Sequence, residues 1–247
     1  LNHKIFKNFQ SLEVKYRKKT YKLRIYLFGS IQIKNLLMAI LASKLCGLKI
    51  KNIFKKIEKI KSVEGRLELI RTLPNKSKIF LDYAHTPDAL KNAILSLREH
   101  FKKKITVIFG CGGERDKSKR SLMGKVAKKY CDKIYITDDN PRNENAKKIR
   151  KDIMRGLKNS DAKEIGNRKK AILYALKNSD PYEIILIAGK GHETYQDLGK
   201  RKIFLSDKNI TKNFKNKNIF LEKKWKDLKY NGAILKRTLK TKKNYFF

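Results

Sequence analysis

The stretch IYITDDNPR, residues 134–142, is a short apolar run that ends in two acids, an Asn, a Pro and an Arg. The apolar run predicts a buried strand, and the polar residues predict a loop at its carboxyl end. Ligands of open α/β sheets bind at the carboxyl ends of the strands, so this loop is a candidate binding element. Taken alone, the same residues are equally typical of a surface turn. The neighbouring stretches of the chain decide between the two interpretations.

Three further stretches have the same form, an apolar run followed by a polar or glycine-rich loop. The strand–loop pairs are Lys78–Leu81 with DYAH (82–85), Ile105–Phe109 with GCGGERD (110–116), and Glu183–Ala188 with GKGHE (189–193). Helices are expected between them at 88–100, 121–130, 144–157 and 168–176, with a short strand at 163–165. Strands that alternate with helices predict an α/β fold with a Rossmann-like, mostly parallel sheet. Right-handed crossovers then bring all four loops to one edge of that sheet.

Residues 1–65 have a different pattern. Short alternating strands are expected up to residue 28, followed by helices from Asn35 and over Ile50–Ile60. Gly65 interrupts the helical pattern and marks a predicted domain boundary. The doubly wound domain is expected over residues 66–212, and a Lys-rich piece follows at 213–247.

The chain has 247 residues, of which 40% are hydrophobic, and this composition is typical of a chain with a folded core. Its net charge of +39 suggests nucleic acid or an anionic membrane surface as a partner. However, the Lys residues are scattered, and abundant Lys, Ile and Asn are what an A+T-biased coding sequence produces. A solvated basic surface is therefore favoured over a nucleic-acid footprint.

Cysteine usage and hydropathy indicate a cytoplasmic protein. Cys46, Cys111 and Cys131 are odd in number and lack CxxC spacing, so neither a disulfide framework nor a zinc site is expected. The longest apolar stretch, Leu36–Leu48, contains Lys44 and is too short to span a bilayer. No signal peptide is recognisable, and the chain looks cut at both ends, since it opens on Leu and closes on Tyr-Phe-Phe.

The glycine-rich loop indicates an anion site. Gly110, Gly112 and Gly113 allow backbone N–H groups to approach an anion ahead of a helix. The loop is not a GxGxxG motif with a downstream ribose-binding acid, which argues against a nicotinamide-dependent enzyme.

The charged residues of the loops suit a zwitterionic ligand. Arg115, Arg120 and Arg142 are guanidinium groups that prefer carboxylates, and Glu193 is an acid suited to an ammonium group. Together they predict a pocket for an amino acid, with mutual pairing of these charges as the alternative. No catalytic role is assigned to His85 or His192 because neither has nucleophile or metal spacing. Two methionines, Met38 and Met123, are expected in the core.

Five motifs, in this order and at these separations, resemble the Mur ligase family over about residues 29–207. They are GRLE (65–68), DYAHTPDAL (82–90), FGCGGERDKSKRSLMG (109–124), TDDNPR (137–142) and IAGKGHETYQ (187–196). The resemblance implies an ATP-dependent amide ligase of peptidoglycan precursor synthesis that acts with Mg²⁺. In that reaction ATP phosphorylates a carboxylate of UDP-MurNAc-L-Ala-D-Glu, and the amino group of meso-diaminopimelate attacks the acyl phosphate.

The resemblance also implies site residues. The residues that match the family's amino-acid site are Arg115, Asp139, Asn140, Pro141, Arg142, Gly189 and Glu193. The residues that match its ATP contacts are Asn35, Arg66 and Asp82, although GSIQIKN (29–35) departs from the usual GxFNxxN pattern. Arg142 suits a selector, because diaminopimelate has a second carboxylate that lysine lacks, and an unpaired buried guanidinium penalises lysine by a few kcal/mol.

The resemblance also defines what this sequence lacks. No GxxGK[ST] phosphate loop occurs in it, so residues 1–65 are expected to be the end of the central ATPase domain. The missing domains and the Mg²⁺ ligands of the ligase are expected upstream, so no catalytic or metal-binding residue is assigned, and the chain alone is expected not to catalyse ligation. Residues 213–247 are expected to be a basic tail or the start of the next ligase of the pathway. The alternative function is a basic nucleic-acid-binding protein. The sequence contains no RNA-binding motif of interleaved aromatic and basic residues, and this argues against the alternative.

Overall fold

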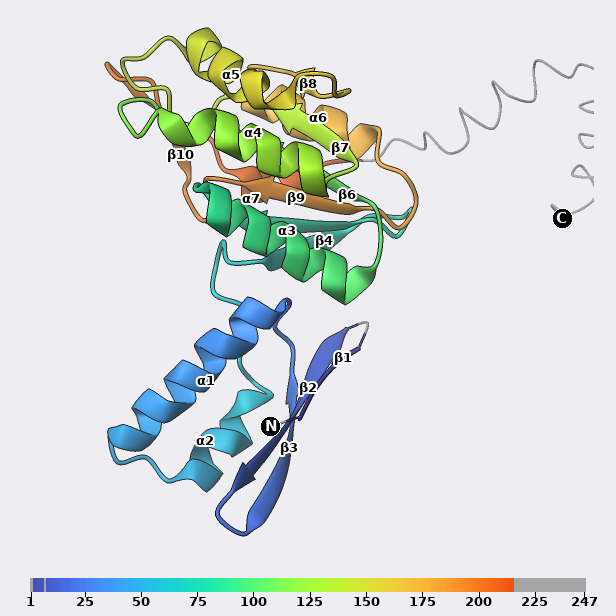
Figure 1. The fold of residues 1–247 in the computed structure, drawn as a ribbon, viewed down its shortest axis with the longest axis vertical. Helices are drawn as coiled ribbons and strands as arrows, with labels where there is room; N and C mark the ends of the chain where they lie inside the picture. Colours follow the sequence, from blue (N-terminus) through green and yellow to red (C-terminus); the bar gives the residue numbers. More distant parts are fainter. Residues whose placement is uncertain (1, 7, 216–247) are drawn as a thin grey trace, which may run out of the picture. The chain divides into compact units, whose positions relative to one another are not determined.

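The computed structural model describes residues 2–6 and 8–215, and its largest element is a six-stranded sheet (Figure 1). The strand order is β4-β5-β9-β6-β7-β8, and β5, β9, β6, β7 and β8 run parallel while β4 pairs antiparallel with β5. The strands are β4 (Glu68–Thr72), β5 (Lys78–Asp82), β6 (Ile105–Phe109), β7 (Lys133–Ile136), β8 (Lys163–Glu164) and β9 (Ile184–Ala188). The predicted Rossmann-like, mostly parallel α/β sheet is confirmed.

Helices cover both faces of this sheet. The helices are α3 (Pro87–Phe101), α4 (Ser118–Tyr130), α5 (Ala146–Met154), the 3-10 turn η1 (Arg155–Leu157), α6 (Arg168–Lys177) and α7 (Asp207–Lys212). Apolar side chains of α3, α4 and α5 share one core cluster with Val107 and Phe109 of β6 and Leu186 of β9. Helices α6 and α7 contact the sheet as well, α6 at β6 and β7 and α7 at β4 and β5. Central strands buried on both faces need nearly continuous apolar runs, which explains ITVIF and IILIA.

Local capping chemistry sets where the helices begin. Thr86 accepts a hydrogen bond from the Ala89 N–H at 3.3 Å, and Pro87 is the first residue of α3, so the predicted start of this helix is confirmed within one residue. Helix α4 begins three residues earlier than predicted, at Ser118. The Asp116 carboxylate accepts from the Ser118 N–H at 2.8 Å, and this turn joins the glycine-rich loop to the helix.

The N-terminal residues form a separate layer with its own hydrophobic cluster. The antiparallel strands β1 (Asn2–Phe6), β2 (Phe9–Tyr16) and β3 (Lys19–Ile25) share this cluster with helices α1 (Ser30–Leu45) and α2 (Ile50–Ile57). Helix α1 begins at Ser30 and not at Asn35, because Gly29 takes a φ of +85° that ends the preceding strand segment. The prediction for Met38 is wrong, since its side chain is 67% exposed on α1, whereas Met123 is fully buried as predicted.

A short hairpin follows the GKGHE loop and is absent from the sequence-based prediction. Strands β10 (Tyr195–Asp197) and β11 (Lys202–Phe204) pair antiparallel. Three-residue strands carry too little alternation to be detected from sequence. The hairpin matters for the site, because the Asp197 carbonyl accepts from the Arg142 N–H at 3.1 Å.

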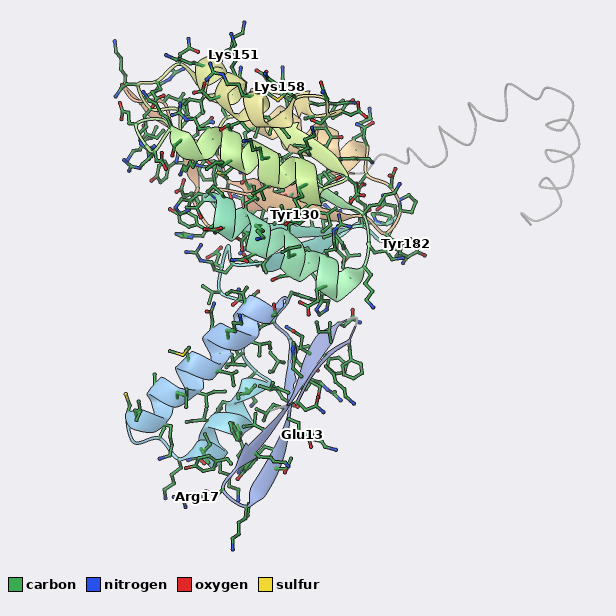
Figure 2. The ribbon with its side chains drawn as sticks, in the orientation of Figure 1. Glu13, Arg17, Tyr130, Lys151, Lys158 and Tyr182 are labelled. Atoms are coloured by element: carbon green, nitrogen blue, oxygen red, sulfur yellow. The ribbon has the colours of Figure 1, made fainter. Side chains whose placement is uncertain are left out.

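Contacts group the chain up to Asn213 into one compact unit, so the predicted boundary near residue 65 stays a prediction. The predicted tail, residues 213–247, lies outside the described residues from residue 216 onward. Every helix in the described part of the chain is too short or too polar to cross a bilayer. Charged side chains such as Lys151 and Lys158 point away from the fold (Figure 2).

Candidate functional site

The DDNPR loop lies directly on the glycine-rich loop. The Gly113 N–H donates to the Asn140 carbonyl at 2.9 Å. A Cβ atom at Gly110 would meet the Thr137 carbonyl oxygen at 2.2 Å, and one at Gly113 would meet the Pro141 carbonyl oxygen at 1.9 Å. Glycine is therefore required here for close backbone packing. The prediction that the Gly113 N–H binds an anion is wrong, because this N–H already donates to the Asn140 carbonyl. We call the loops 82–85, 110–116, 137–142 and 189–193 the loop cluster.

Asn140 joins the DDNPR loop to the GKGHE loop. Its Nδ2 donates to Glu193 Oε2 at 2.9 Å, and its Oδ1 accepts from Lys190 Nζ at 2.9 Å. The same Oδ1 accepts from the Asp197 N–H at 3.0 Å. The structure therefore brings Asn140 and Glu193, two of the predicted site residues, into direct contact.

Glu193 is held as a carboxylate. Burial by itself raises the pKa of Glu193, but the hydrogen bonds from Lys190 and Asn140 outweigh burial and lower the pKa below its ordinary value. Lys190 Nζ lies 2.8 Å from Glu193 Oε2, and its side chain is fully buried. Lys190 is not among the residues predicted from the sequence, where the neighbouring Gly189 and Gly191 are the one local sign of a constrained position.

Arg142 is anchored but keeps unused donors. The residue has a φ of +52°, a conformation that a non-glycine residue adopts only when its surroundings impose it. Its NH1 donates to the Gly113 carbonyl at 2.7 Å, and its Nε lies 3.7 Å from the Asp197 carboxylate. The side chain is 22% exposed, so part of the guanidinium fork remains accessible to a ligand carboxylate.

Asp139 and Gly189 form the buried floor of the loop cluster. Asp139 is 8% exposed, and burial raises its pKa, while Arg168 and Lys190 oppose the rise. A Cβ atom at Gly189 would lie 2.6 Å from Asp139 Oδ2, and Gly189 has a φ of +107°. Both features require glycine at this position.

A buried ion pair holds the strand ends next to Asp139 and Gly189, and it was not predicted from the sequence. Arg168 Nε and NH2 bind the Asp207 carboxylate at 2.9 and 2.7 Å, and both side chains are almost completely buried. Arg168 NH2 also donates to the Ala188 carbonyl at 3.0 Å, and NH1 lies 3.4 Å from the Asp138 carbonyl. One guanidinium thus fixes the ends of two strands that carry site loops.

The two other arginines differ. Arg115 is exposed, and its NH1 lies 3.2 Å from the Glu114 carbonyl, which leaves most donors to solvent. Arg120 is fully buried and bonds Glu144 at 2.9 Å and Asp152 at 3.0 Å. The prediction that Arg120 binds a ligand carboxylate is therefore wrong, and the alternative of mutual pairing holds for this residue.

The residues predicted to contact ATP lie near the start of β4. Arg66 is exposed and stacks over the Tyr83 ring at 4.6 Å from its centroid. Asp82 accepts from the Leu67 and Ala84 N–H groups at 2.8 Å each, and burial raises its pKa. Asn35 is exposed on α1, one turn beyond Gln32, whose Nε2 donates to the Arg66 carbonyl at 3.2 Å. Arg66 thus presents an exposed cation and Asn35 an exposed amide, whereas the Asp82 carboxylate holds the backbone.

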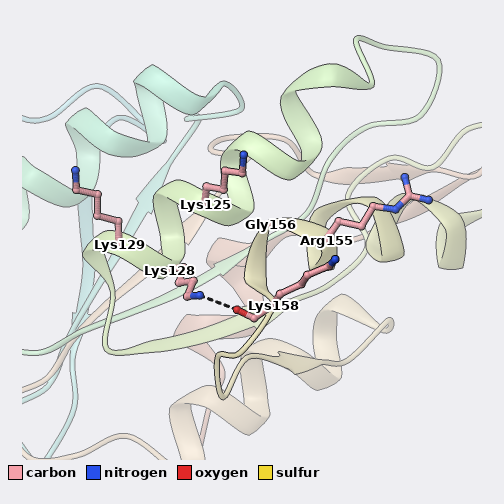
Figure 3. A pocket seen from close by; sticks show the side chains of 6 residues that line it. All are labelled: Lys125, Lys128, Lys129, Arg155, Gly156 and Lys158. Carbon is pink, nitrogen blue, oxygen red and sulfur yellow. Dashed lines mark hydrogen bonds between the residues drawn. The ribbon is translucent and has the colours of Figure 1, made fainter.

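A hollow of about 450 Å³ lies over α4 and η1, outside the loop cluster (Figure 3). We call it the basic hollow; it is lined by Lys125, Lys128, Lys129, Arg155, Gly156 and Lys158. A Cβ atom at Gly156 would meet the Ser121 carbonyl oxygen at 2.0 Å, so this glycine lets η1 approach α4 closely. That approach brings the basic side chains together, and Lys128 Nζ donates to the Lys158 carbonyl at 2.6 Å.

Comparisons with known proteins agree with this geometry. A family profile described as "Mur ligase, glutamate ligase domain" matches residues 65–191. The UDP-N-acetylmuramoyl-L-alanyl-D-glutamate--2,6-diaminopimelate ligase of Rickettsia montanensis is 42% identical over 82% of this chain and 42% of its own length. The enzyme of that name from Buchnera aphidicola is 46% identical over 78% of this chain and 39% of its own length. The chain thus spans about two fifths of the length of these relatives.

Solved structures give the same picture. The structure of a UDP-N-acetylmuramoyl-L-alanyl-D-glutamate--2,6-diaminopimelate ligase is similar with a TM-score of 0.63 and 28% identity, over 85% of this chain and 43% of that one. The UDP-N-acetylmuramate-alanine ligase of Thermotoga maritima has a TM-score of 0.58 at 21% identity, over 77% of this chain and 41% of that one, which shows a shared fold.

Proposed function

Because this chain belongs to the Mur ligase family, we propose that it carries the amino-acid-binding part of a peptidoglycan-precursor ligase. The complete enzyme would form an amide between meso-diaminopimelate and UDP-MurNAc-L-Ala-D-Glu in the cytoplasm. ATP, bound with Mg²⁺, would supply the activation of the substrate carboxylate. The relatives named as 2,6-diaminopimelate ligases support this choice of substrate.

One observation supports the proposal, namely that the loop cluster holds an anchored carboxylate and an anchored guanidinium on two loops that Asn140 joins. Glu193 is joined to Asn140, and Arg142 contacts the carbonyl of Gly113 in the neighbouring loop. A carboxylate of lowered pKa suits a ligand ammonium, and a guanidinium with free donors suits a ligand carboxylate. Diaminopimelate presents one carboxylate more than lysine does, and Arg142 is the residue proposed to bind it.

The proposed amino-acid site consists of Arg115, Asp139, Asn140, Pro141, Arg142, Gly189 and Glu193. The proposed ATP contacts are Asn35, Arg66 and Asp82. Arg66 and Asn35 are exposed and so are accessible to a nucleotide. Asp82 would act indirectly, because its two carboxylate oxygens hold the Leu67 and Ala84 N–H groups.

The proposed division of the chain follows the same assignment. Residues 1–65 would be the end of the ATP-binding domain and residues 66–212 the amino-acid-binding domain. Two separate hydrophobic clusters, one in the N-terminal layer and one around the parallel sheet, support this division.

Calorimetric titration of the chain with meso-diaminopimelate and with L-lysine tests the proposal. We expect meso-diaminopimelate to bind at least about 10-fold more tightly, because one charged hydrogen-bonded pair contributes about 1.5–3 kcal/mol. Replacing Arg142 by Met should remove this preference and leave lysine binding unchanged, while Arg155→Met in the basic hollow serves as the control. Equal binding of the two amino acids, or binding of neither, would contradict the proposal.

The alternative, a basic nucleic-acid-binding protein, makes a separate prediction. Its DNA affinity would fall steeply with salt and would not respond to Arg142→Met. Family membership and the buried pairing of charges in the loop cluster favour the ligase.

A further inference from the structure

Lys190 is a fully buried lysine placed between two residues of the proposed amino-acid site. Lysine is rarely buried unless it is paired, and here Nζ lies 2.9 Å from Asn140 Oδ1 and 2.8 Å from Glu193 Oε2. We propose that Lys190 is a positioning residue that orients the Asn140 carboxamide and shares Glu193 with the ammonium group of the bound amino acid. This inference rests on the proposed function of the site and assigns a role to a residue outside the predicted set.

The contacts of Lys190 decide which way the Asn140 side chain faces. An ammonium group can only donate, so the Asn140 atom beside Lys190 must be the carbonyl oxygen. A carboxylate can only accept, so the atom beside Glu193 must be the amide nitrogen. The two neighbours therefore exclude the flipped carboxamide.

The remaining hydrogen-bonding capacity of Asn140 then fixes what it can bind. Oδ1 has two lone pairs, and Lys190 Nζ and the Asp197 N–H use both. Nδ2 has two hydrogens, and Glu193 accepts one. One N–H remains, so Asn140 can act toward a ligand only as a donor. A ligand carboxylate fits this position, and a ligand ammonium does not.

Lys190 also controls the charge of Glu193. The charged or titratable groups acting on Glu193 or bonded to it are Lys190, Arg168, Asp139 and Tyr83. Arg168 is already committed to the buried carboxylate beneath the floor, and Asp139 and Tyr83 add no positive charge. Lys190 is therefore the cation that bonds Glu193 directly, and its hydrogen bond is the largest of the contacts that lower the pKa of that carboxyl.

The backbone around Lys190 is built to turn its side chain inward. Gly189 and Gly191 have φ values of +107° and +51°, so a non-glycine residue would be strained at either position. The Glu193 N–H donates to the Lys190 carbonyl at 2.9 Å and closes a tight turn that sets both side chains side by side. The pair is thus organised before binding, which lowers the entropic cost of binding.

The first experiment needs no ligand. The carboxyl group of Glu193 is titrated by carbon-detected NMR in the wild-type 247-residue chain and in Lys190→Met, Lys190→Arg and Lys170→Met. We expect the pKa of Glu193 to rise in Lys190→Met, to stay low in Lys190→Arg, and to be unchanged in Lys170→Met, whose lysine is exposed on α6. An unchanged pKa of Glu193 in Lys190→Met would overturn the proposal, whether or not the chain binds diaminopimelate.

The second experiment measures binding of meso-diaminopimelate to the same four proteins. Affinity should fall about 10- to 100-fold in Lys190→Met, recover in part in Lys190→Arg, and stay unchanged in Lys170→Met. If the wild-type chain binds no diaminopimelate, the proposed function fails, and the titration of Glu193 still decides the role of Lys190. If binding in Lys190→Met matches the wild type, the role of Lys190 is refuted.

A measurement on the wild type covers the case in which Lys190→Met does not fold. The ammonium protons of Lys190 should exchange slowly with water in nitrogen-15 NMR, because the group is buried and hydrogen-bonded. Exchange as fast as that of the exposed Lys170 would show that the two hydrogen bonds do not persist in solution, and would refute the proposal.

Discussion

The cations of the loop cluster and those of the basic hollow differ in burial and in pairing with carboxylates. In the loop cluster, Lys190 is buried and bonds Glu193, and Arg168 beneath it bonds Asp207. The cations of the basic hollow are exposed, and within the described residues the structure pairs Arg155 with the Asp152 carboxylate at 2.9 Å and gives the hollow's lysines no carboxylate partner. A buried charge must be paired because desolvation is costly, whereas an exposed lysine is solvated by water.

Burial and pairing separate the charges that bear on function from those that do not. Most of the net charge of +39 comes from exposed cations like those of the basic hollow, and it reflects composition more than binding. The few buried cations have defined positions, because each is bonded to partners at fixed distances. Substitutions in the two regions should therefore differ in their effect on stability and binding.

Breaking the buried pair should have the largest effect. Replacing Asp207 by Ala leaves the fully buried Arg168 guanidinium without its carboxylate, and we expect a loss of about 3–5 kcal/mol in the free energy of unfolding. Urea denaturation measures it. Lys125→Gln in the basic hollow is the matched control and should change stability by less than about 0.5 kcal/mol. Similar losses in the two variants would show that burial does not separate the two regions.

Adding a methyl group where the glycine-rich loop contacts the DDNPR loop should have the next largest effect. A methyl group at Gly113 would lie 1.9 Å from the Pro141 carbonyl, so Gly113→Ala should cost about 1–3 kcal/mol. The matched variant is Gly112→Ala, where the nearest atom is the movable Arg142 NH1 at 3.0 Å. It should disturb diaminopimelate selectivity more than stability.

The buried Cys111 thiol provides a local readout for these two variants. Burial raises its pKa to about 12, so alkylation by iodoacetamide should be slow in the folded wild type and faster in Gly113→Ala. Cys46 is exposed and serves as the internal standard for labelling. Unaltered labelling of Cys111 in Gly113→Ala would mean that the loop contact is looser than the distances indicate.

Acid should weaken the loop cluster through Glu193. Because its folded-state pKa is lowered, the stabilisation from its hydrogen bonds is complete above the ordinary value of 4.5 and is lost as the pH falls through the folded-state pKa. The stability difference between wild type and Glu193→Gln should therefore be constant from pH 7 to pH 5 and shrink at lower pH. A difference that grows on acidification would reverse the assigned direction of the pKa.

The smallest effect is expected in the basic hollow at low salt. Lys125 and Lys129 are four residues apart on α4, so their repulsion costs about 0.2–0.5 kcal/mol. Lys125→Gln should recover this amount at low ionic strength, and the gain should vanish in 1 M salt, where charges are screened. Thermal melts at two salt concentrations measure it, and a gain that survives high salt would require a cause other than charge.

Much of the fold could be predicted because its causes are local. Capping residues such as Thr86 and apolar runs such as ITVIF act within a few residues, so sequence patterns record them. The edge strand β4 was missed because ELIRT mixes charged and apolar residues and has no continuous apolar run. The β10–β11 hairpin was missed because its strands have only three residues each. Met38 was misplaced because helical periodicity shows which residues share a face and not what covers that face.

The alternation of strands and helices, the edge at which the loops meet, and the motifs that resemble the Mur ligases can all be read from the sequence. Which charges pair depends on the tertiary structure. Arg120 bonds Glu144 and Asp152, 24 and 32 residues away, and so is not available to a ligand. Lys190 bonds Asn140 from 50 residues away. Such partners leave no periodic trace in the sequence, because the sheet, and not the local chain, brings them together.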